Sequence, residues 1–241
     1  MPYHIRIRQS QIGDTAIIVG DRARVQVVAS KLKNPVQIGS NREYLTFTGN
    51  FGNKKITVMS TGIGGPAAAI AIEELAQLGV KTIIRVGTCG SLDRLINIGD
   101  VVVAEAALRM DGTTRQYVQE GYPAAASPDV IIALCKAASA LGVRYRSGLS
   151  ASSDAFYVGE GKKSFAKYTP EYSRRLSRDM HNANILCIEM ETSTLFTLGR
   201  LFGIRTGAAL AVIDNYLTNK LVPDAGIEDA IKVALEAIKG L

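Results

Sequence analysis

The chain of 241 residues has no tryptophan, only two histidines and only three cysteines. The cysteines Cys89, Cys135 and Cys187 lack the C-x-x-C spacing of a metal or redox site, and three thiols cannot all pair within one chain. We therefore expect reduced thiols. No group of His, Cys or carboxylate residues has the spacing of metal ligands, so we expect no metal site.

Long apolar runs are also missing. No segment approaches the roughly 18 uncharged apolar residues that a membrane span requires, and the opening MPYHIRIRQS lacks the apolar stretch of a signal peptide. We therefore expect a cytoplasmic protein without a membrane partner. Because no segment has the composition of a linker, the chain is predicted to form one domain over residues 1–241.

The formal net charge of +6 could indicate a nucleic-acid-binding protein. However, basic residues are scattered and often adjoin acidic ones. The densest basic stretch, Arg174, Arg175 and Arg178, has Tyr172 nearby but no interleaved aromatic residues for stacking on bases. We therefore predict a mixed solvated surface, a few arginines for a small anion, and no nucleic-acid partner.

Short apolar runs alternate with helical stretches, which predicts a three-layer αβα fold. Residues 158–187 are polar, basic and weakly periodic, and we interpret them as a long excursion that could act as a lid. Asp224 is expected to cap the last helix. The predicted strands cover 15–19, 56–59, 82–86, 100–107, 144–151 and 206–213. The predicted helices cover 22–31, 66–78, 128–141 and 191–202, and a last helix is predicted after residue 224.

Glycine turns and charged residues follow several of the predicted strands. They occur at 20–22, 62–66 and 87–90, and Asp214 ends another strand. Ligands of open α/β sheets bind at the carboxyl ends of strands, so we expect a site there. The glycine loops match neither a P-loop nor a G-x-G-x-x-G motif, and each is interpreted as either a tight turn or an anion cradle.

Arg85 interrupts the otherwise apolar strand TIIRV. Desolvating a guanidinium group without a partner is costly, so Arg85 is interpreted either as one half of a structural salt bridge or as the ligand of an oxyanion. Thr88 could donate its hydroxyl to the same anion. Arg24 lies on the predicted first turn of a helix after Gly20, where backbone N–H groups also attract anions. This combination suits phosphate.

Acidic residues mark two further positions. Glu189 and Glu191 flank Met190 at a predicted strand-to-helix junction, either as helix N-terminal acids or as acceptors for a sugar diol. Asp214 is either a turn residue or a partly desolvated acid that could donate a proton to a leaving group. His4 alone indicates no more than a surface residue.

The segments VGDRAR, NREY, STGIGGPAAAIAIEELAQLG, IIRVGTCGSL, INIGDVVV, SSDAFY and IEMETSTLF run the length of the chain. Through them the chain resembles the trimeric and hexameric nucleoside phosphorylases, the purine nucleoside and uridine phosphorylase family. The resemblance implies a mixed central sheet flanked by helices. It also implies cleavage of a nucleoside by inorganic phosphate to free base and ribose 1-phosphate, without a metal or organic cofactor.

The resemblance also implies roles for individual residues. It makes Asp214 and Arg85 catalytic, and it implies a hexamer of three dimers in which His4 and Arg42 reach the neighbouring subunit's site. The phosphate set is Gly20, Arg24, Arg42, Arg85 and Thr88, the ribose set is His4, Met190 and Glu191, and the base set is Cys89, Gly90, Phe156, Glu160, Lys162, Ile188 and Asp214.

The base is assigned from positions at which this chain differs from the uridine phosphorylases of the family. Uridine phosphorylases carry a Gln, an Arg and a further Arg where this chain has Glu160, Lys162 and Tyr216. Purine enzymes place an Asp at the position of Asp214 to protonate N7 of the base. We therefore expect a purine nucleoside, with uridine as the alternative; Lys220 is a candidate to assist Asp214. A nucleosidase using water and a non-catalytic nucleoside-binding protein are more remote alternatives.

Overall fold

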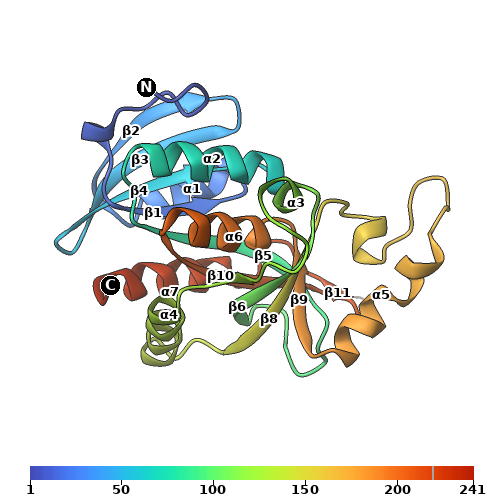
Figure 1. Ribbon diagram of the computed structural model, residues 1–241. Coiled ribbons are helices and arrows are strands. Elements are labelled where there is room, and N and C mark those ends of the chain that lie inside the picture. The colour runs from blue at the N-terminus through green and yellow to red at the C-terminus, as the bar shows by residue number, and fades with distance from the viewer. Residues whose placement is uncertain (219) are drawn as a thin grey trace.

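The computed structural model describes residues 1–218 and 220–241 and confirms the αβα architecture (Figure 1). One mixed sheet runs in the order β11-β10-β6-β8-β9-β5-β1-β4-β3-β2, with β7 beside β6. Its strands are β1 Thr15–Val19, β2 Lys33–Asn41, β3 Tyr44–Phe51, β4 Lys54–Ser60, β5 Thr82–Ser91, β6 Val101–Met110, β7 Ala124–Ala125, β8 Tyr145–Ser153, β9 Ile185–Glu189, β10 Arg205–Asn215 and β11 Lys220–Leu221.

Helices cover both faces of this sheet (Figure 1). α2 and α6 contribute to one apolar cluster, and α1, α4 and α7 contribute to a second cluster on the opposite face. The helices are α1 Arg22–Ala29, α2 Gly65–Gln77, α3 Thr113–Tyr117, α4 Pro128–Ala140, α5 Glu171–Asn182, α6 Thr192–Phe202 and α7 Ile227–Lys239, with the 3-10 turns η1 Gln9–Gln11 and η2 Val158–Glu160.

Half of the sheet curls until it meets itself. β5 pairs in parallel with β10, β10 is antiparallel to β6, β6 is parallel to β8, β8 is parallel to β9, and β9 returns antiparallel to β5. Because β5 also pairs with β1, it lies at the junction between this closed ring and the open part of the sheet. The carboxyl end of β5 is therefore surrounded by several strand ends.

The predicted elements with strong local signals are confirmed. Every residue of β1 is buried, as its continuous apolar run requires. Pro66 lies in the first turn of α2, and Ser127 precedes Pro128 at the start of α4. The Ser127 hydroxyl does not cap α4 but instead accepts a hydrogen bond from the backbone N–H of Thr206, which ties α4 to β10.

The structure corrects one sequence interpretation and adds two features that the sequence did not reveal. Asp224 does not cap α7, because the N-cap residue is Gly226, and Asp224 instead pairs with Arg24. The excursion at 158–187 contains regular structure, namely α5 and the first residues of β9. The hairpin of β2 and β3 was not anticipated: most residues of β2 are exposed, so β2 lacks an apolar pattern.

The N-terminal segment is fixed onto α2 by Glu74. This buried carboxylate accepts hydrogen bonds from the backbone N–H groups of His4 (3.0 Å) and Ile5 (2.8 Å) and contacts His4 Nδ1 at 2.7 Å. Burial opposes ionisation, but these hydrogen bonds outweigh it and lower the pKa of Glu74. His4 is thereby held in one ring orientation, with Nδ1 occupied.

Across the described residues, the chain contains no helix with the length and apolar character needed to cross a membrane.

Candidate functional site

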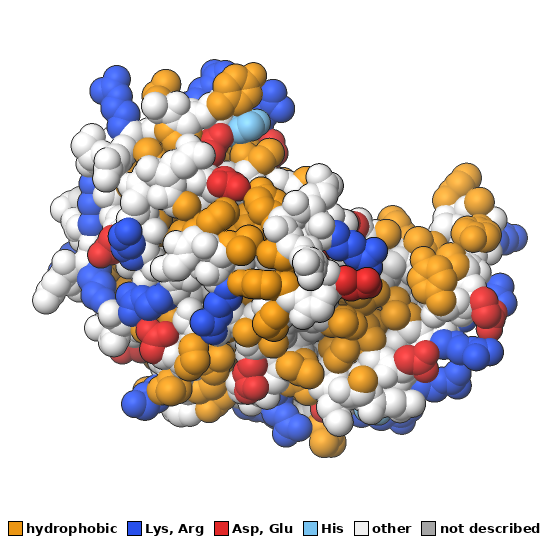
Figure 2. Space-filling model, in the orientation of Figure 1, with side chains coloured by type: hydrophobic (Ala, Val, Ile, Leu, Met, Phe, Trp, Pro, Cys, Tyr) orange, Lys and Arg blue, Asp and Glu red, His pale blue; other side chains and the backbone are white. Residues whose placement is uncertain are grey.

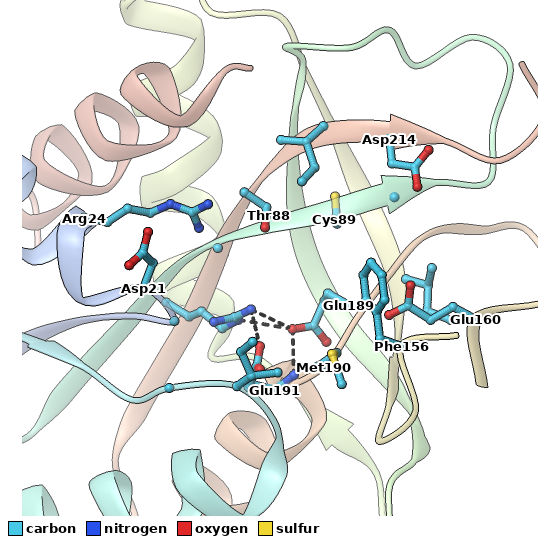
Figure 3. Close-up of a pocket in the computed structure, with 18 of the residues that line it drawn as sticks. Asp21, Arg24, Thr88, Cys89, Phe156, Glu160, Glu189, Met190, Glu191 and Asp214 are labelled. Atoms are coloured by element: carbon cyan, nitrogen blue, oxygen red, sulfur yellow. Dashed lines mark hydrogen bonds and ion pairs between the residues drawn. The ribbon is translucent and has the colours of Figure 1, made fainter. Parts of the chain in front are cut away.

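A cavity of about 630 Å³ opens at the carboxyl ends of β1, β5 and β10, within the usual range for small-molecule sites. It adjoins the hollow between the body of the molecule and the projecting segment that includes α5, where hydrophobic side chains gather (Figure 2). Figure 3 shows Asp21, Arg24 and Thr88 at one end of the cavity and Phe156, Glu160 and Asp214 at the other. We refer to these as the arginine end and the Phe156 end.

The arginine end is built on the turn from β1 into α1. Asp21 caps α1, since its carboxylate accepts the N–H of Ala23 at 2.9 Å. This places Arg24 on the first helical turn, where its NH2 group contacts Asp224 Oδ1 at 3.1 Å. Its buried Nε has no hydrogen-bond partner among the described residues. Arg24 lines the cavity beside a helix N-terminus, a combination that is suited to an anion.

Arg85 lies between the two ends and is only 4% exposed. Its NH2 group contacts Glu191 Oε2 at 2.5 Å and Glu189 Oε2 at 3.1 Å, and its Nε also donates to Glu189 at 3.1 Å. The salt-bridge interpretation of Arg85 is therefore confirmed. Because Arg85 also lines the cavity, the oxyanion interpretation is compatible with this pairing and stays a prediction.

The two glutamates occupy the junction between β9 and α6. Glu189 accepts the N–H groups of Glu191 (2.8 Å) and Thr192 (3.0 Å) and the hydroxyl of Ser152. Glu191 accepts the N–H of Gly64 at 2.5 Å, which connects it to the start of α2. Burial raises the pKa of Glu191 even though Arg85 opposes this shift. Met190, between them, faces the cavity.

The Phe156 end contains a chain of polar contacts. Lys162 Nζ lies 3.3 Å from both Glu160 Oε2 and Asp214 Oδ2 and 3.7 Å from the centre of the Phe156 ring. The Tyr216 hydroxyl contacts Glu160 Oε2 at 2.5 Å. Burial raises the pKa of Glu160, with Tyr216 and Lys162 opposing it, and burial beside Glu160 raises the pKa of Tyr216.

An irregularity in β10 brings Asp214 to this end. Val212 pairs with Cys89 and Asp214 pairs with Gly90, so Ile213 has no register partner on β5. Successive residues of a regular strand point to opposite faces, and an extra residue breaks that alternation. As a result, Ile213 and Asp214 both line the cavity although they are adjacent in sequence.

The cavity brings together most of the residues that the sequence predicted. Those that line it are Gly20, Arg24, Arg85, Thr88, Cys89, Gly90, Phe156, Glu160, Lys162, Ile188, Met190, Glu191 and Asp214. His4 and Arg42 do not line it within this chain. Arg42 instead accepts a hydrogen bond on its backbone carbonyl from Arg22, which does line the cavity. Lys220 is exposed on β11 and does not line the cavity either.

Sequence reasoning did not identify the partner of Glu189, and it gave no site role to Tyr216. Glu189 was recognisable only as one of two acids at a junction, and its function as the partner of Arg85 depends on β9 lying beside β5. Tyr216 was read as the loss of an arginine, whereas its ring packs on Gly90: a Cβ added to Gly90 would lie 2.1 Å from the ring. Neither contact leaves a local signal in the sequence.

All three cysteines are free thiols, as expected. Cys89 lines the cavity, and Cys187 is buried beside it on β9. The neighbouring Cys89 and burial both raise the pKa of Cys187, which favours the unreactive thiol form. Among residues 1–218 and 220–241, no group of three or more His, Cys, Asp or Glu side chains could hold a metal ion.

Several known proteins to which this chain is similar are nucleoside phosphorylases. Residues 14–240 match the family model of the phosphorylase superfamily. A uridine phosphorylase of Thermococcus kodakarensis is 44% identical over 99% of this chain and 86% of its own length. A uridine phosphorylase of Haemophilus influenzae is 38% identical, and a guanosine phosphorylase of Halorubrum lacusprofundi is 34% identical. Each of these two alignments covers 99% of this chain and 98% of the relative.

Proposed function

Since the chain belongs to the phosphorylase superfamily and is a nucleoside phosphorylase, we propose that it cleaves uridine with inorganic phosphate to uracil and ribose 1-phosphate. The observation that carries this proposal is the order of side chains along one cavity: arginine and helix N-terminus, then buried carboxylates, then a polar aromatic end (Figure 3). This order matches the order of phosphate, ribose and base in the reaction.

Phosphate is assigned to the arginine end. Arg24, Thr88 and the backbone at Gly20 offer donors there, and the N-terminus of α1 adds its dipole. Glu191 and Met190 then lie where the ribose hydroxyls would be bound. As the glycosidic bond breaks, positive charge develops at C1′, and the phosphate dianion both stabilises this charge and attacks. The protein contributes position and electrostatics rather than a covalent nucleophile.

Uracil is supported over the purine that the sequence favoured. The relatives at 44% and 38% identity are uridine phosphorylases. In addition, Asp214 Oδ2 contacts the Lys162 ammonium group at 3.3 Å, and an ammonium group can only donate hydrogen bonds to its partner. This pairing weakens the expectation that Asp214 protonates N7 of a departing purine.

Guanosine is the second candidate. It is favoured by the relative named guanosine phosphorylase, at 34% identity, and by the carboxylates of Glu160 and Asp214 at the Phe156 end. A carboxylate can accept the N–H groups that guanine presents.

The test is a substrate panel of uridine, guanosine, inosine and adenosine, with and without phosphate. Uridine is expected to be consumed only when phosphate is present, with ribose 1-phosphate formed in equal amount to uracil. Release of uracil at the same rate in phosphate-free buffer would indicate a hydrolase. Cleavage of guanosine without cleavage of uridine would replace the proposed substrate by the second candidate.

The ion pair between Arg24 and Asp224 gives a prediction for phosphate affinity. Asp224 is largely exposed and competes with phosphate for the guanidinium group. An exposed pair of this kind contributes little, so Asp224→Asn is expected to lower the KM for phosphate about two- to fivefold. Asp229→Asn is the matched control, because Asp229 pairs with Lys232 on α7 and should leave that KM unchanged. A higher phosphate KM in Asp224→Asn would contradict the proposed competition.

We also propose that the enzyme assembles as a hexamer of three dimers. His4 and Arg42 lie outside the cavity of their own chain, and in this assembly each would serve the site of the neighbouring subunit. The contact between Glu74 and Nδ1 of His4 leaves Nε2 as the ring nitrogen available to a neighbour's ribose.

A further inference from the structure

The base-recognition end of the cavity contains a carboxylate and an ammonium group side by side. Glu160 follows β8 in η2, and Lys162 lies two residues later. Lys162 Nζ and Glu160 Oε2 are 3.3 Å apart, and both residues line the cavity. Glu160 is 3% exposed. A buried acceptor beside a fixed donor is a directional pair that a ligand must match.

The second oxygen of Glu160 is the one left for a ligand. Both the Tyr216 hydroxyl and the Lys162 ammonium group contact Oε2. None of the contacts made by the described residues uses Oε1, and this atom is not among the buried polar atoms that lack a partner. Oε1 is therefore the oxygen open to a ligand, and in the carboxylate form that Tyr216 and Lys162 favour it accepts a hydrogen bond.

Two neighbours keep this pair in place. Tyr216 packs against Gly90 of β5 and donates its hydroxyl to Glu160. Asp214 also contacts the ammonium group of Lys162 at 3.3 Å, and this ammonium group lies over the Phe156 ring. Tyr216 and Asp214 are thus positioning residues for an acceptor and a donor that contact the base directly.

The complement of this pair is an N–H group next to a carbonyl. Uracil has this edge at N3–H and C4=O, and guanine and hypoxanthine have it at N1–H and C6=O. Cytosine and adenine present the reverse order, a bare ring nitrogen beside an amino group. With those bases, Glu160 would face a lone pair and Lys162 would face an N–H donor.

We propose that Glu160 and Lys162 select bases by this lactam edge, so that the enzyme accepts keto bases and rejects amino bases in pyrimidine and purine nucleosides alike. The proposal rests on the nucleoside phosphorolysis proposed above and names the chemistry by which that site chooses its base. Uracil and guanine, the bases to which the names of two relatives refer, both carry this edge.

The test compares kcat/KM for uridine with cytidine and for guanosine with adenosine, using the unmodified enzyme and saturating phosphate. A site built to hydrogen-bond its substrate strongly rejects analogues that leave its groups unpaired, so each keto/amino ratio is expected to be about 100 or more. Cytidine cleavage within tenfold of uridine would overturn the proposal. Rejection of guanosine together with adenosine would overturn its extension to purines.

These outcomes separate the inference from the proposed substrate. Cleavage of guanosine but not of uridine or adenosine would remove uridine as the substrate and retain selection by the edge among purines. Equal cleavage of all four nucleosides in the presence of phosphate would retain phosphorolysis and remove the selection. The panel requires no variant, so it is independent of any folding defect.

Variants test whether Glu160 and Tyr216 determine the selection between keto and amino bases. Glu160→Leu removes both acceptor oxygens and keeps a side chain of similar length, and is expected to reduce the uridine/cytidine ratio at least tenfold with little change in the KM for phosphate. Glu171→Leu is the matched control on the exposed face of α5 and should keep the ratio. Tyr216→Phe removes only the hydroxyl and is expected to lower the same ratio, which a merely structural role would not change. An unaltered ratio in Glu160→Leu would contradict the assignment.

Discussion

Replacing Arg85 by alanine is expected to lower the free energy of unfolding by about 3–5 kcal/mol, because removing one member of a buried ion pair leaves its partners without compensation. Here two carboxylates, Glu189 and Glu191, would lose the same cation, and both are almost fully buried. Chemical denaturation measures the effect as a lower midpoint. The same variant is expected to need a much higher phosphate concentration, because the charge beside the reacting centre is lost.

The structural and catalytic effects of Arg85 can be separated by two further variants. Arg175→Ala removes an arginine whose partner Glu171 is exposed on α5, and it should change the unfolding midpoint very little. Arg85→Lys keeps the charge but loses the planar group that reaches Glu189 and Glu191 together. If Arg85→Ala had the phosphate KM of the unmodified enzyme, Arg85 would be only a structural ion-pair partner.

Gly90→Ala is expected to reduce kcat/KM for uridine about 100-fold or more. A Cβ at this position would lie 2.1 Å from Cε2 of Tyr216, so the ring must move and take its hydroxyl away from Glu160. Forcing an extra methyl group into a packed site also costs about 1–3 kcal/mol of stability. Steady-state kinetics with uridine, together with a denaturation curve, measures both effects.

The control for Gly90→Ala is Gly121→Ala, where an added Cβ would meet no atom within 4 Å. It should leave activity and stability unchanged. Unimpaired uridine cleavage by Gly90→Ala would mean that Tyr216 can leave its position without consequence, and would remove its role in holding Glu160.

The sequence predicts the parts of this fold whose signals are local. β1 and β5 are apolar because both sides of each strand are covered, and a proline in the first turn marks the starts of α2 and α4. The edge strand β2 has no such signal, since most of its residues face solvent. α5 was missed because it buries only Ser173 and Met180 and is otherwise polar.

The site residues also divide into those with a local sequence signal and those without one. Gly20 was found because it directly follows a strand, Thr88 because it lies near the end of one, and Arg24 because it lies in the first turn of the helix after β1. The ion pair of Lys162 with Asp214 was not predictable, because the two residues belong to distant segments that meet only when β10 lies beside β5. The purine expectation assigned Asp214 a role without this partner.

The unpaired Ile213 in β10 has a consequence for how this cavity can change its chemistry. Removing one residue at that point would restore regular alternation and turn either Ile213 or Asp214 away from the cavity. Deleting a single residue could therefore change this part of the cavity lining from acidic to aliphatic, without any residue being substituted. In this enzyme the length of a strand, as much as the identity of its residues, determines which chemical groups line the cavity.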